Sequence, residues 1–297
     1  MRHYNNNDFS IFKKIFDAKI LPIMLYGAEV WGLEKSVKYC ESLHLYAMKK
    51  FLAVDIKTPN DFVYKELNRY PITIICAVNC LRYWLKLLRM DDSRLPKKAY
   101  HMLHHMDERR KKNWVTNVRE LLTRHGFGVV WYQQNVGNDM SFLKLLKQRL
   151  IDTRMQTLDG HLNESERFGF YVNISSHDFF TLPKYISLDI NRQLKVIMTR
   201  FRFGVSDINV HRLRYKNCNP AQLLCNYCKD IEENELHFIL CCPLYSDIRQ
   251  RYIPFKYHRE PNLFRLTILL NNTQDQIVEN LCRFLYHAFK IRSITMS

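Results

Sequence analysis

The sequence predicts a mainly α-helical fold, a chain of several helical units with a small metal-binding module near the C-terminus. Three observations support this prediction. The 297 residues include only 8 Gly and 9 Pro, so few tight turns are available for a fold with many strands. Hydrophobic residues make up 47% of the chain, and many recur at helical spacing. Four cysteines and one histidine lie close together in residues 225–243.

The first half of the chain is expected to form helices that are separated at proline and glycine positions. The most regular of them starts near Pro71, and its apolar positions recur every three or four residues, with Trp84 expected to pack on the same face. Apolar periodicity predicts helices, in order, over 8–33 with a break near Pro22, from Ser36 to Leu52, from the break at 57–61 through Glu66, and over 72–90.

The second half continues this pattern, with more irregular segments between helices. Gly126 is a natural C-terminal residue for one helix, and Thr273 with Gln276 has the spacing of a capping box for the last. The expected order is a helix over 113–124, a loop over 134–139, a helix over 140–158, loops and short helices over 160–183, a helix over 187–203, the Cys/His cluster, and a final helix from Thr273.

The charge of the chain indicates a polyanionic partner. Lys and Arg number 45 against 29 Asp and Glu, which gives a net charge of +16. Nucleic acid is the first candidate partner and an anionic membrane surface the second. Two stretches, 97–112 and 192–216, concentrate this charge. Phe201 and Phe203 lie in the second stretch and are expected in the core. The candidate phosphate contacts are Arg109, Arg110, Lys111, Lys112, Arg200, Arg202, Arg212, Arg214 and Lys216.

The sequence predicts neither a secretory signal nor a membrane span. The first fourteen residues are polar, and the most apolar early stretch, 20–28, is far shorter than the roughly 20 residues that cross a bilayer. We therefore expect no membrane association and an intracellular location, nuclear or cytoplasmic. The nine cysteines are then expected to be reduced thiols or metal ligands.

The Cys/His cluster matches the ligand preferences of Zn²⁺, which takes thiolates and imidazoles in a tetrahedron. Cys225 and Cys228, spaced Cys-x2-Cys, supply two ligands from one turn. His237 with Cys242 supplies the other two, although Cys241 competes because four residues after His237 it lies on the same helical face. Three thiolates and one imidazole leave no open position for water, so the site is expected to stabilise the fold and not to catalyse.

Several motifs resemble one protein family. "HFILCCPLYSDIRQRYI" at 237–253 resembles the zinc-binding region at the C-terminus of non-LTR (LINE-type) retrotransposon reverse transcriptases. "ILPIMLYGAEVWG" at 20–32 and "TPNDFVYKELNRYPI" at 58–72 resemble segments that follow the polymerase palm in the same proteins, in the same order. In that family the histidine pairs with the cysteine directly before the proline. The resemblance thus implies a CCHC zinc knuckle made by Cys225, Cys228, His237 and Cys242, with Cys241 as a spare thiol.

The resemblance also implies a division of the chain. Residues 1–58 correspond to a thumb-like helical segment after a palm that is missing here, 59–160 to a helical spacer, and 161–297 to a basic region with the knuckle and a C-terminal helix. Such a chain is expected to bind template RNA or target DNA with low sequence specificity.

Polymerase chemistry needs carboxylates that hold two Mg²⁺ ions. The only Asp-Asp pair, Asp91-Asp92, follows a helical run and is expected to be a solvated helix end. The chain is therefore expected not to be an enzyme. Two alternatives stay open at this point: a zinc-stabilised protein-interaction module, and part of an RNA-directed DNA polymerase whose palm is supplied elsewhere.

Overall fold

The computed structural model describes residues 8–163, 169–175, 181–213 and 219–295. In these ranges the regular structure is helical, and the extended pairing is limited to one antiparallel bridge between Leu224 and Glu232. The prediction of a mainly α fold is confirmed. No helix in the described ranges has both the length and the apolar character that crossing a membrane requires.

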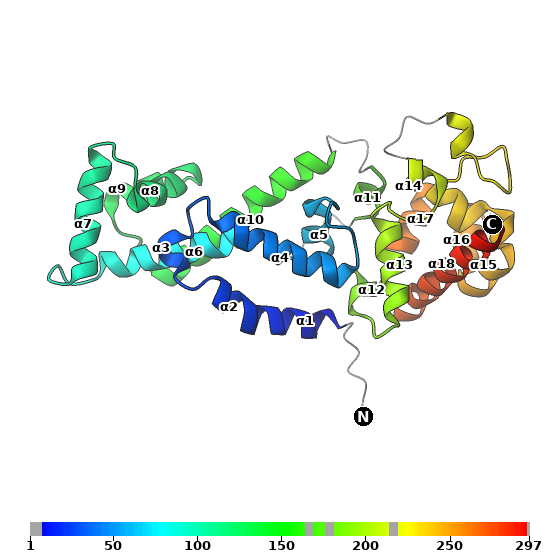
Figure 1. Ribbon diagram of the computed structural model, residues 1–297, viewed down its shortest axis with the longest axis horizontal. Helices are drawn as coiled ribbons and strands as arrows, with labels where there is room; N and C mark the ends of the chain where they lie inside the picture. Colours follow the sequence, from blue (N-terminus) through cyan, green and yellow to red (C-terminus); the bar gives the residue numbers. More distant parts are fainter. Residues whose placement is uncertain (1–7, 164–168, 176–180, 214–218, 296–297) are drawn as a thin grey trace, which may run out of the picture. The chain divides into compact units, whose positions relative to one another are not determined.

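Figure 1 labels the helices in chain order. The first part of the described chain contains α1 (Phe9–Ile15), the π-helix η1 (Phe16–Ile20), α2 (Leu21–Met24), α3 (Ala28–Trp31), α4 (Val37–Leu52), α5 (Asn60–Glu66), α6 (Ile72–Leu88), α7 (Leu95–Glu108), α8 (Trp114–Arg124), α9 (Gly128–Gln133) and α10 (Asp139–Asn163). The second part contains α11 (Gly169–Ile174), α12 (Lys184–Ser187), α13 (Arg192–Arg202), α14 (Asn209–Leu213), the 3-10 helix η3 (Pro220–Leu223), the π-helix η4 (His237–Cys241), the 3-10 helix η5 (Pro243–Tyr245), α15 (Ser246–Tyr252), α16 (Phe255–His258), α17 (Leu263–Leu270) and α18 (Asp275–Thr295).

The chain forms two compact units, each assembled from separate segments. Unit 1 comprises 1–14, 48–68 and 160–297, and unit 2 comprises 15–47 and 69–159. The family resemblance divides the chain into three consecutive segments, 1–58, 59–160 and 161–297, and this division stays a prediction. The two compact units have different boundaries, because each unit combines segments that are separate in the sequence.

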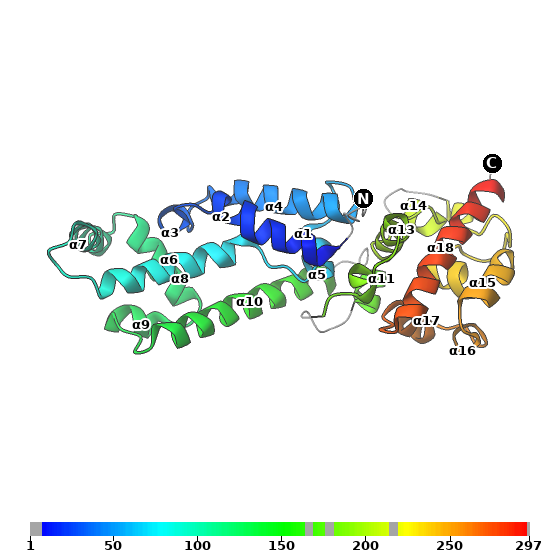
Figure 2. The same cartoon turned by 90° about the horizontal axis from the view of Figure 1, so that it is seen from below.

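Unit 2 has an apolar core built around α6. Trp84 of α6 is fully buried, stacks on Trp131 with ring centroids 5.9 Å apart, and donates its indole N–H to the Tyr100 hydroxyl at 3.2 Å. Leu146 and Leu150 of α10 belong to the same cluster. Figures 1 and 2 both show α6 and α10 running side by side. Burial of one such side chain contributes about 1.5–3 kcal/mol, so this cluster stabilises unit 2.

Two local features fix the shorter helices of unit 2. A Cβ at Gly32 would lie 2.9 Å from the Cβ of Cys76, so glycine is needed where α3 meets α6. Asn113 caps α8: its Oδ1 accepts from the backbone N–H of Val115 at 2.8 Å, and Thr116 Oγ1 accepts from the backbone N–H of Asn113 at 3.0 Å. The sequence prediction for this helix, 113–124, is correct to one residue.

The described part of unit 1 contains two buried pairs between an arginine and a glutamate. Arg202 of α13 donates to Glu66 of α5 at 2.6 Å, and both side chains are almost fully buried. The hydroxyls of Tyr171 and Tyr185 donate to the same carboxylate at 2.8 and 2.7 Å. Burial raises the pKa of both tyrosines well above their ordinary value, so they stay protonated and can donate.

The second buried pair joins Glu233 to Arg292 of α18. Arg292 Nε and Nη2 each donate to a different oxygen of Glu233 at 2.8 Å, and Nη2 also donates to Asn209 Oδ1 at 3.1 Å. This bidentate pairing ties the start of α14 and the chain before η4 to the C-terminal helix.

The boundaries of three predicted helices are wrong. The first helix does not break at Pro22, because the π-turn η1 places Pro22 in the first turn of α2, where a missing N–H is tolerated. The break comes at Gly27, whose φ is +70°. The helix expected over 187–203 begins later, at Arg192, because α12 ends at Ser187 and Asn191 caps α13 by accepting from the backbone N–H of Gln193 at 2.8 Å. The last helix begins at Asp275, after Asn272 accepts from the backbone of the following turn.

Candidate metal centre and basic pocket

Cys225 and Cys228 lie in a tight turn of unit 1. The backbone N–H of Cys225 donates to the carbonyl of Ile231 at 2.7 Å, and that of Lys229 donates to the carbonyl of Cys225 at 2.7 Å. Lys229 adopts a left-handed backbone with φ +65°, which reverses the chain. Both thiols consequently approach one partner, since each sulfur lies 3.9 Å from the sulfur of Cys242.

The π-helix η4 positions the other two side chains. It begins at His237, and the backbone N–H of Cys242 donates to the His237 carbonyl at 2.8 Å, a five-residue step. A π-turn places residues five apart on one face, whereas an α-turn places residues four apart there. Cys242 therefore faces the same point as His237, and Cys241 lies outside the group.

The four side chains Cys225, Cys228, His237 and Cys242 can hold a metal ion. Their ligand atoms all lie within 4.8 Å of one another. A tetrahedral ion with bonds of about 2.3 Å to sulfur separates its thiolates by about 3.8 Å, close to the two sulfur distances observed. The described cysteines are free thiols, so no disulfide competes for these sulfurs in that part of the chain.

His237 gives independent support for a cation. The side chain is buried, and neither ring nitrogen has a hydrogen-bond partner. Burial lowers the pKa of His237, which favours the neutral imidazole that metals bind. Buried ring nitrogens are normally paired. A metal ion bound to one ring nitrogen of His237 would give that nitrogen a partner.

Arg249 donates hydrogen bonds to the backbone of the metal-binding turn. Its Nε donates to the carbonyl of Ile239 at 2.7 Å, and its Nη2 donates to the carbonyl of Cys242 at 2.7 Å. These bonds satisfy carbonyls at the end of η4, where helical partners are missing. The arginine that follows the Cys-Pro motif thus acts on the backbone that holds Cys242.

The candidate phosphate contacts fall into different settings. Arg200 and Arg212 are exposed in unit 1, and the prediction for Arg202 is wrong because its guanidinium is buried against Glu66. Arg214 and Lys216 lie outside the described residues. The basic run Arg109, Arg110, Lys111 and Lys112 is exposed between α7 and α8 of unit 2.

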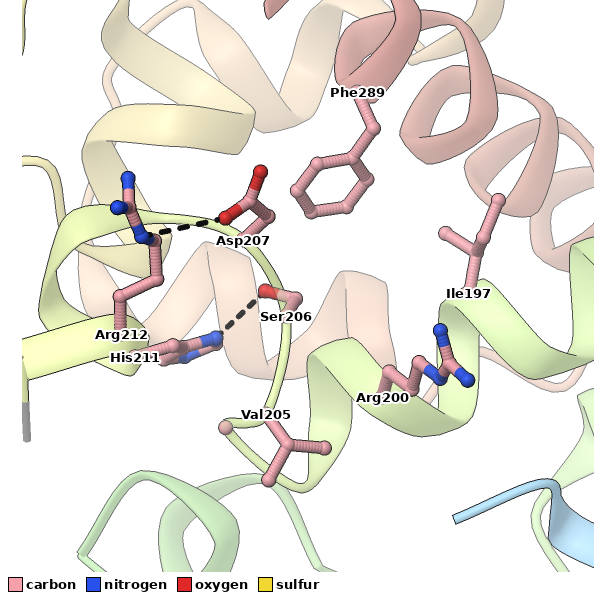
Figure 3. Close-up of a pocket in the computed structure, with 9 residues that line it drawn as sticks. Ile197, Arg200, Val205, Ser206, Asp207, His211, Arg212 and Phe289 are labelled. Atoms are coloured by element: carbon pink, nitrogen blue, oxygen red, sulfur yellow. Dashed lines mark hydrogen bonds and ion pairs between the residues drawn. The ribbon is translucent and has the colours of Figure 1, made fainter. Parts of the chain in front are cut away.

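A cavity of about 580 Å³ lies between α13, α14 and α18. Arg200 and Arg212 line it from different helices, and Phe289 of α18 points toward its centre (Figure 3). Asp207 stands on the rim, 3.5 Å from Arg212. The cavity therefore combines an aromatic face, two exposed cations and one exposed acid.

A buried polar chain leads away from this cavity. Ser206 Oγ lies 2.7 Å from His211 Nδ1, and His211 Nε2 lies 2.8 Å from Glu235 Oε1. The order resembles a hydrolase triad, but the His211 side chain is 0% exposed, so it contacts Ser206 and Glu235 and not solvent. Its role is to fix the orientation of Ser206 at the cavity wall.

Sequence reasoning did not identify Ser206, His211, Glu235 or Phe289 as parts of one site. Glu235 is buried beside His211. Phe289 is 78 residues from His211, and no spacing rule joins them. Ser206 and His211 are five residues apart, yet only the turn after α13 brings their side chains together.

Comparisons of the chain with protein-family models, with curated proteins and with solved structures find no match.

Proposed function

We propose that this chain is a zinc-stabilised nucleic-acid-binding module, and that it corresponds to the C-terminal region of a non-LTR retrotransposon reverse transcriptase. One observation carries the proposal: Arg200 and Arg212, exposed on two helices, meet at one cavity in the same compact unit as a four-ligand Cys/His group. The family motif at 237–253 supports the same interpretation, since its histidine and second cysteine belong to this group and its arginine donates to the carbonyl of Cys242.

Zn²⁺ is the metal that this ligand set suits best. Three thiolates and a neutral imidazole are typical of structural zinc sites, and harder cations such as Mg²⁺ and Ca²⁺ prefer oxygen ligands. With four protein ligands the ion has no position for water or substrate. The zinc would hold the turn at Cys225 and Cys228 against η4, and its role would be structural.

The nucleic-acid surface would bind mainly through phosphates. Arginine offers a planar fork of N–H donors that matches phosphate oxygens. Affinity would therefore depend on salt more than on sequence.

A salt titration of oligonucleotide binding tests this proposal. The apparent affinity should fall steeply with salt, and Arg212→Gln should weaken binding and reduce the log–log slope by about 0.7–0.9, the value for one phosphate contact. Arg259→Gln is the matched control, because Arg259 is exposed in unit 1 but does not line the cavity. No binding at low salt, or a flat salt dependence, would favour a protein-interaction module.

We also propose that the chain has no polymerase activity of its own. Asp91 and Asp92 are exposed after the end of α6, and Asp91 accepts from Ser93 within a turn. The described ranges contain no strand around this pair that would hold it as a metal site. Primer extension with Mg²⁺ should give no product, and any extension that Asp91→Asn abolishes would contradict the proposal.

A further inference from the structure

We propose that the cavity between α13, α14 and α18 receives one unstacked nucleobase, so that the partner of unit 1 is single-stranded nucleic acid or an unpaired nucleotide. This inference rests on the proposed function and specifies it. The observation behind it is that an aromatic ring, a fixed hydroxyl and two exposed cations line the same cavity (Figure 3).

The size of the cavity suits this occupant. Its volume of about 580 Å³ is within the range of about 300–1,000 Å³ that small-molecule pockets have. A base in a duplex is stacked on both sides and cannot enter such a space without leaving the helix. An unpaired base meets no such cost, so single strands are favoured.

Phe289 is the stacking platform. Its ring packs on the fully buried Phe238, with centroids 4.9 Å apart and planes 31° apart, and it is itself half-buried. The contact with Phe238 fixes the ring, which leaves its cavity side for a ligand. Ile197 and Val205 supply apolar walls. Bases stack on aromatic rings with little sequence preference, because every base has a π-face.

Ser206 supplies a polar contact for the edge of the base. A hydroxyl has one donor and two acceptor positions, and His211 Nδ1 uses only one of these. The pairing of His211 with Glu235 at 2.8 Å holds the imidazole in place. Ser206 therefore keeps hydrogen-bonding capacity in a fixed place on the wall.

The charge of the lining residues agrees with a phosphate backbone that passes over the opening. Arg200 is exposed, and its hydrogen bond within the described part of the chain is a long one, 3.5 Å, to the carbonyl of Ala53. Arg212 is 54% exposed and shares Asp207 with Arg292. Asp207 opposes an anion, so Asp207→Asn should strengthen binding through charge alone.

The experiment compares two oligonucleotides of equal length on the full zinc-loaded chain, by fluorescence anisotropy at low salt. One is oligo-dT, and the other carries abasic residues on the same phosphate backbone. Oligo-dT should bind about 5- to 150-fold more tightly, the range for stacking one base. Phe289→Leu should remove this difference without weakening abasic binding, and Phe264→Leu, at an exposed phenylalanine, should retain it.

Val205→Trp provides a second variant that leaves the core intact. Val205 is 44% exposed, so a larger side chain there fills the cavity from outside and should also abolish the difference. Asp207→Asn should tighten both oligonucleotides equally. Equal binding of the two oligonucleotides to the unsubstituted chain, or a difference that survives Val205→Trp, would overturn the base pocket and leave phosphate binding standing. Failure of both oligonucleotides to bind would instead overturn the proposed function.

Discussion

The two compact units are stabilised in different ways. Unit 2 has a continuous apolar cluster around Trp84, and the Arg119–Asp107 ion pair of this unit has an arginine that is 38% exposed. Unit 1 holds two ion pairs at 1–3% exposure, Glu66–Arg202 and Glu233–Arg292, together with the Cys/His group. Apolar packing is non-directional, whereas a buried charge is stable only with its own partner.

This difference can be followed by spectroscopy because all four tryptophans, Trp31, Trp84, Trp114 and Trp131, belong to unit 2. Tryptophan fluorescence therefore reports unit 2, and hydrogen exchange of peptides from 225–252 reports the metal-binding part of unit 1. Each of the following changes is expected to move one of these measurements and leave the other nearly unchanged.

Removal of the metal should have the largest effect. A strong chelator should abolish exchange protection over 225–252, because structural zinc contributes about 10–16 kcal/mol of apparent binding free energy at pH 7 in small modules. Tryptophan fluorescence should change little. Cys228→Ser should reproduce the loss, and Cys241→Ser should keep one zinc per chain by elemental analysis. Equal zinc content in these two variants would contradict the assignment of ligands.

Breaking the buried ion pair in unit 1 should come next. Arg202→Met removes the cation that pairs with the buried Glu66 and leaves the hydroxyls of Tyr171 and Tyr185 as its partners, so the free energy of unfolding should fall by about 3–5 kcal/mol in urea denaturation monitored by exchange in unit 1. Arg283→Met is the matched control in the exposed pair with Glu279 and should cost about 1 kcal/mol or less. A similar loss of unfolding free energy in both variants would show that burial does not determine how much each ion pair contributes.

A cavity made in the core of unit 2 should lower the free energy of unfolding by a similar or smaller amount than Arg202→Met. This loss should be seen in unit 2 and not in unit 1. Leu146→Ala removes a fully buried side chain and should destabilise unit 2 by about 2–5 kcal/mol, measured by tryptophan fluorescence in urea. Zinc content should not change. The neighbouring Leu145 is 56% exposed, so Leu145→Ala should stay within about 0.5 kcal/mol. Loss of zinc in Leu146→Ala would refute the independence of the two units.

The smallest effect concerns pH. The hydrogen bond from Arg119 holds the pKa of Asp107 below its ordinary value, and Thr116 lowers it further. Between the folded pKa and the ordinary value near 3.8, the unfolded chain binds more protons, so stability falls as pH falls through this window. The advantage of the unsubstituted chain over Asp107→Asn should shrink below about pH 3.8 in fluorescence-monitored unfolding. A constant difference from neutral pH downward would contradict this coupling.

Much of the fold follows from periodicity, and the exceptions have physical causes. The helix α6 was predictable because Val78, Leu81, Leu85 and their neighbours repeat at helical spacing. The path of the chain through Pro22 was not predictable in this way. The π-turn η1 places Pro22 in the first turn of α2, where its missing N–H removes no helical hydrogen bond. The same kind of turn decides between Cys241 and Cys242, which α-helical spacing alone leaves open.

The candidate pocket was less predictable than the metal ligands. A stretch of basic residues indicates charge but not direction, and Arg200 and Arg202 point to opposite environments although they are two residues apart. Arg202 finds Glu66 at a separation of 136 residues. Cysteine spacing constrains a site locally, whereas partners so distant in sequence are fixed only by tertiary packing.

The buried charges affect how a polyanion shifts the equilibrium between the folded and the unfolded chain. In the described ranges six basic side chains are buried against three acidic ones; the basic ones are Lys49, Lys97, Lys195, Arg202, Arg249 and Arg292, and the acidic ones are Glu66, Glu233 and Glu235. The unfolded chain therefore offers a polyanion more cations than the folded chain does. A ligand that prefers the unfolded state destabilises the native one. Heparin in excess, which has no base to place in the cavity, should thus compete with refolding, and moderate salt should relieve that competition.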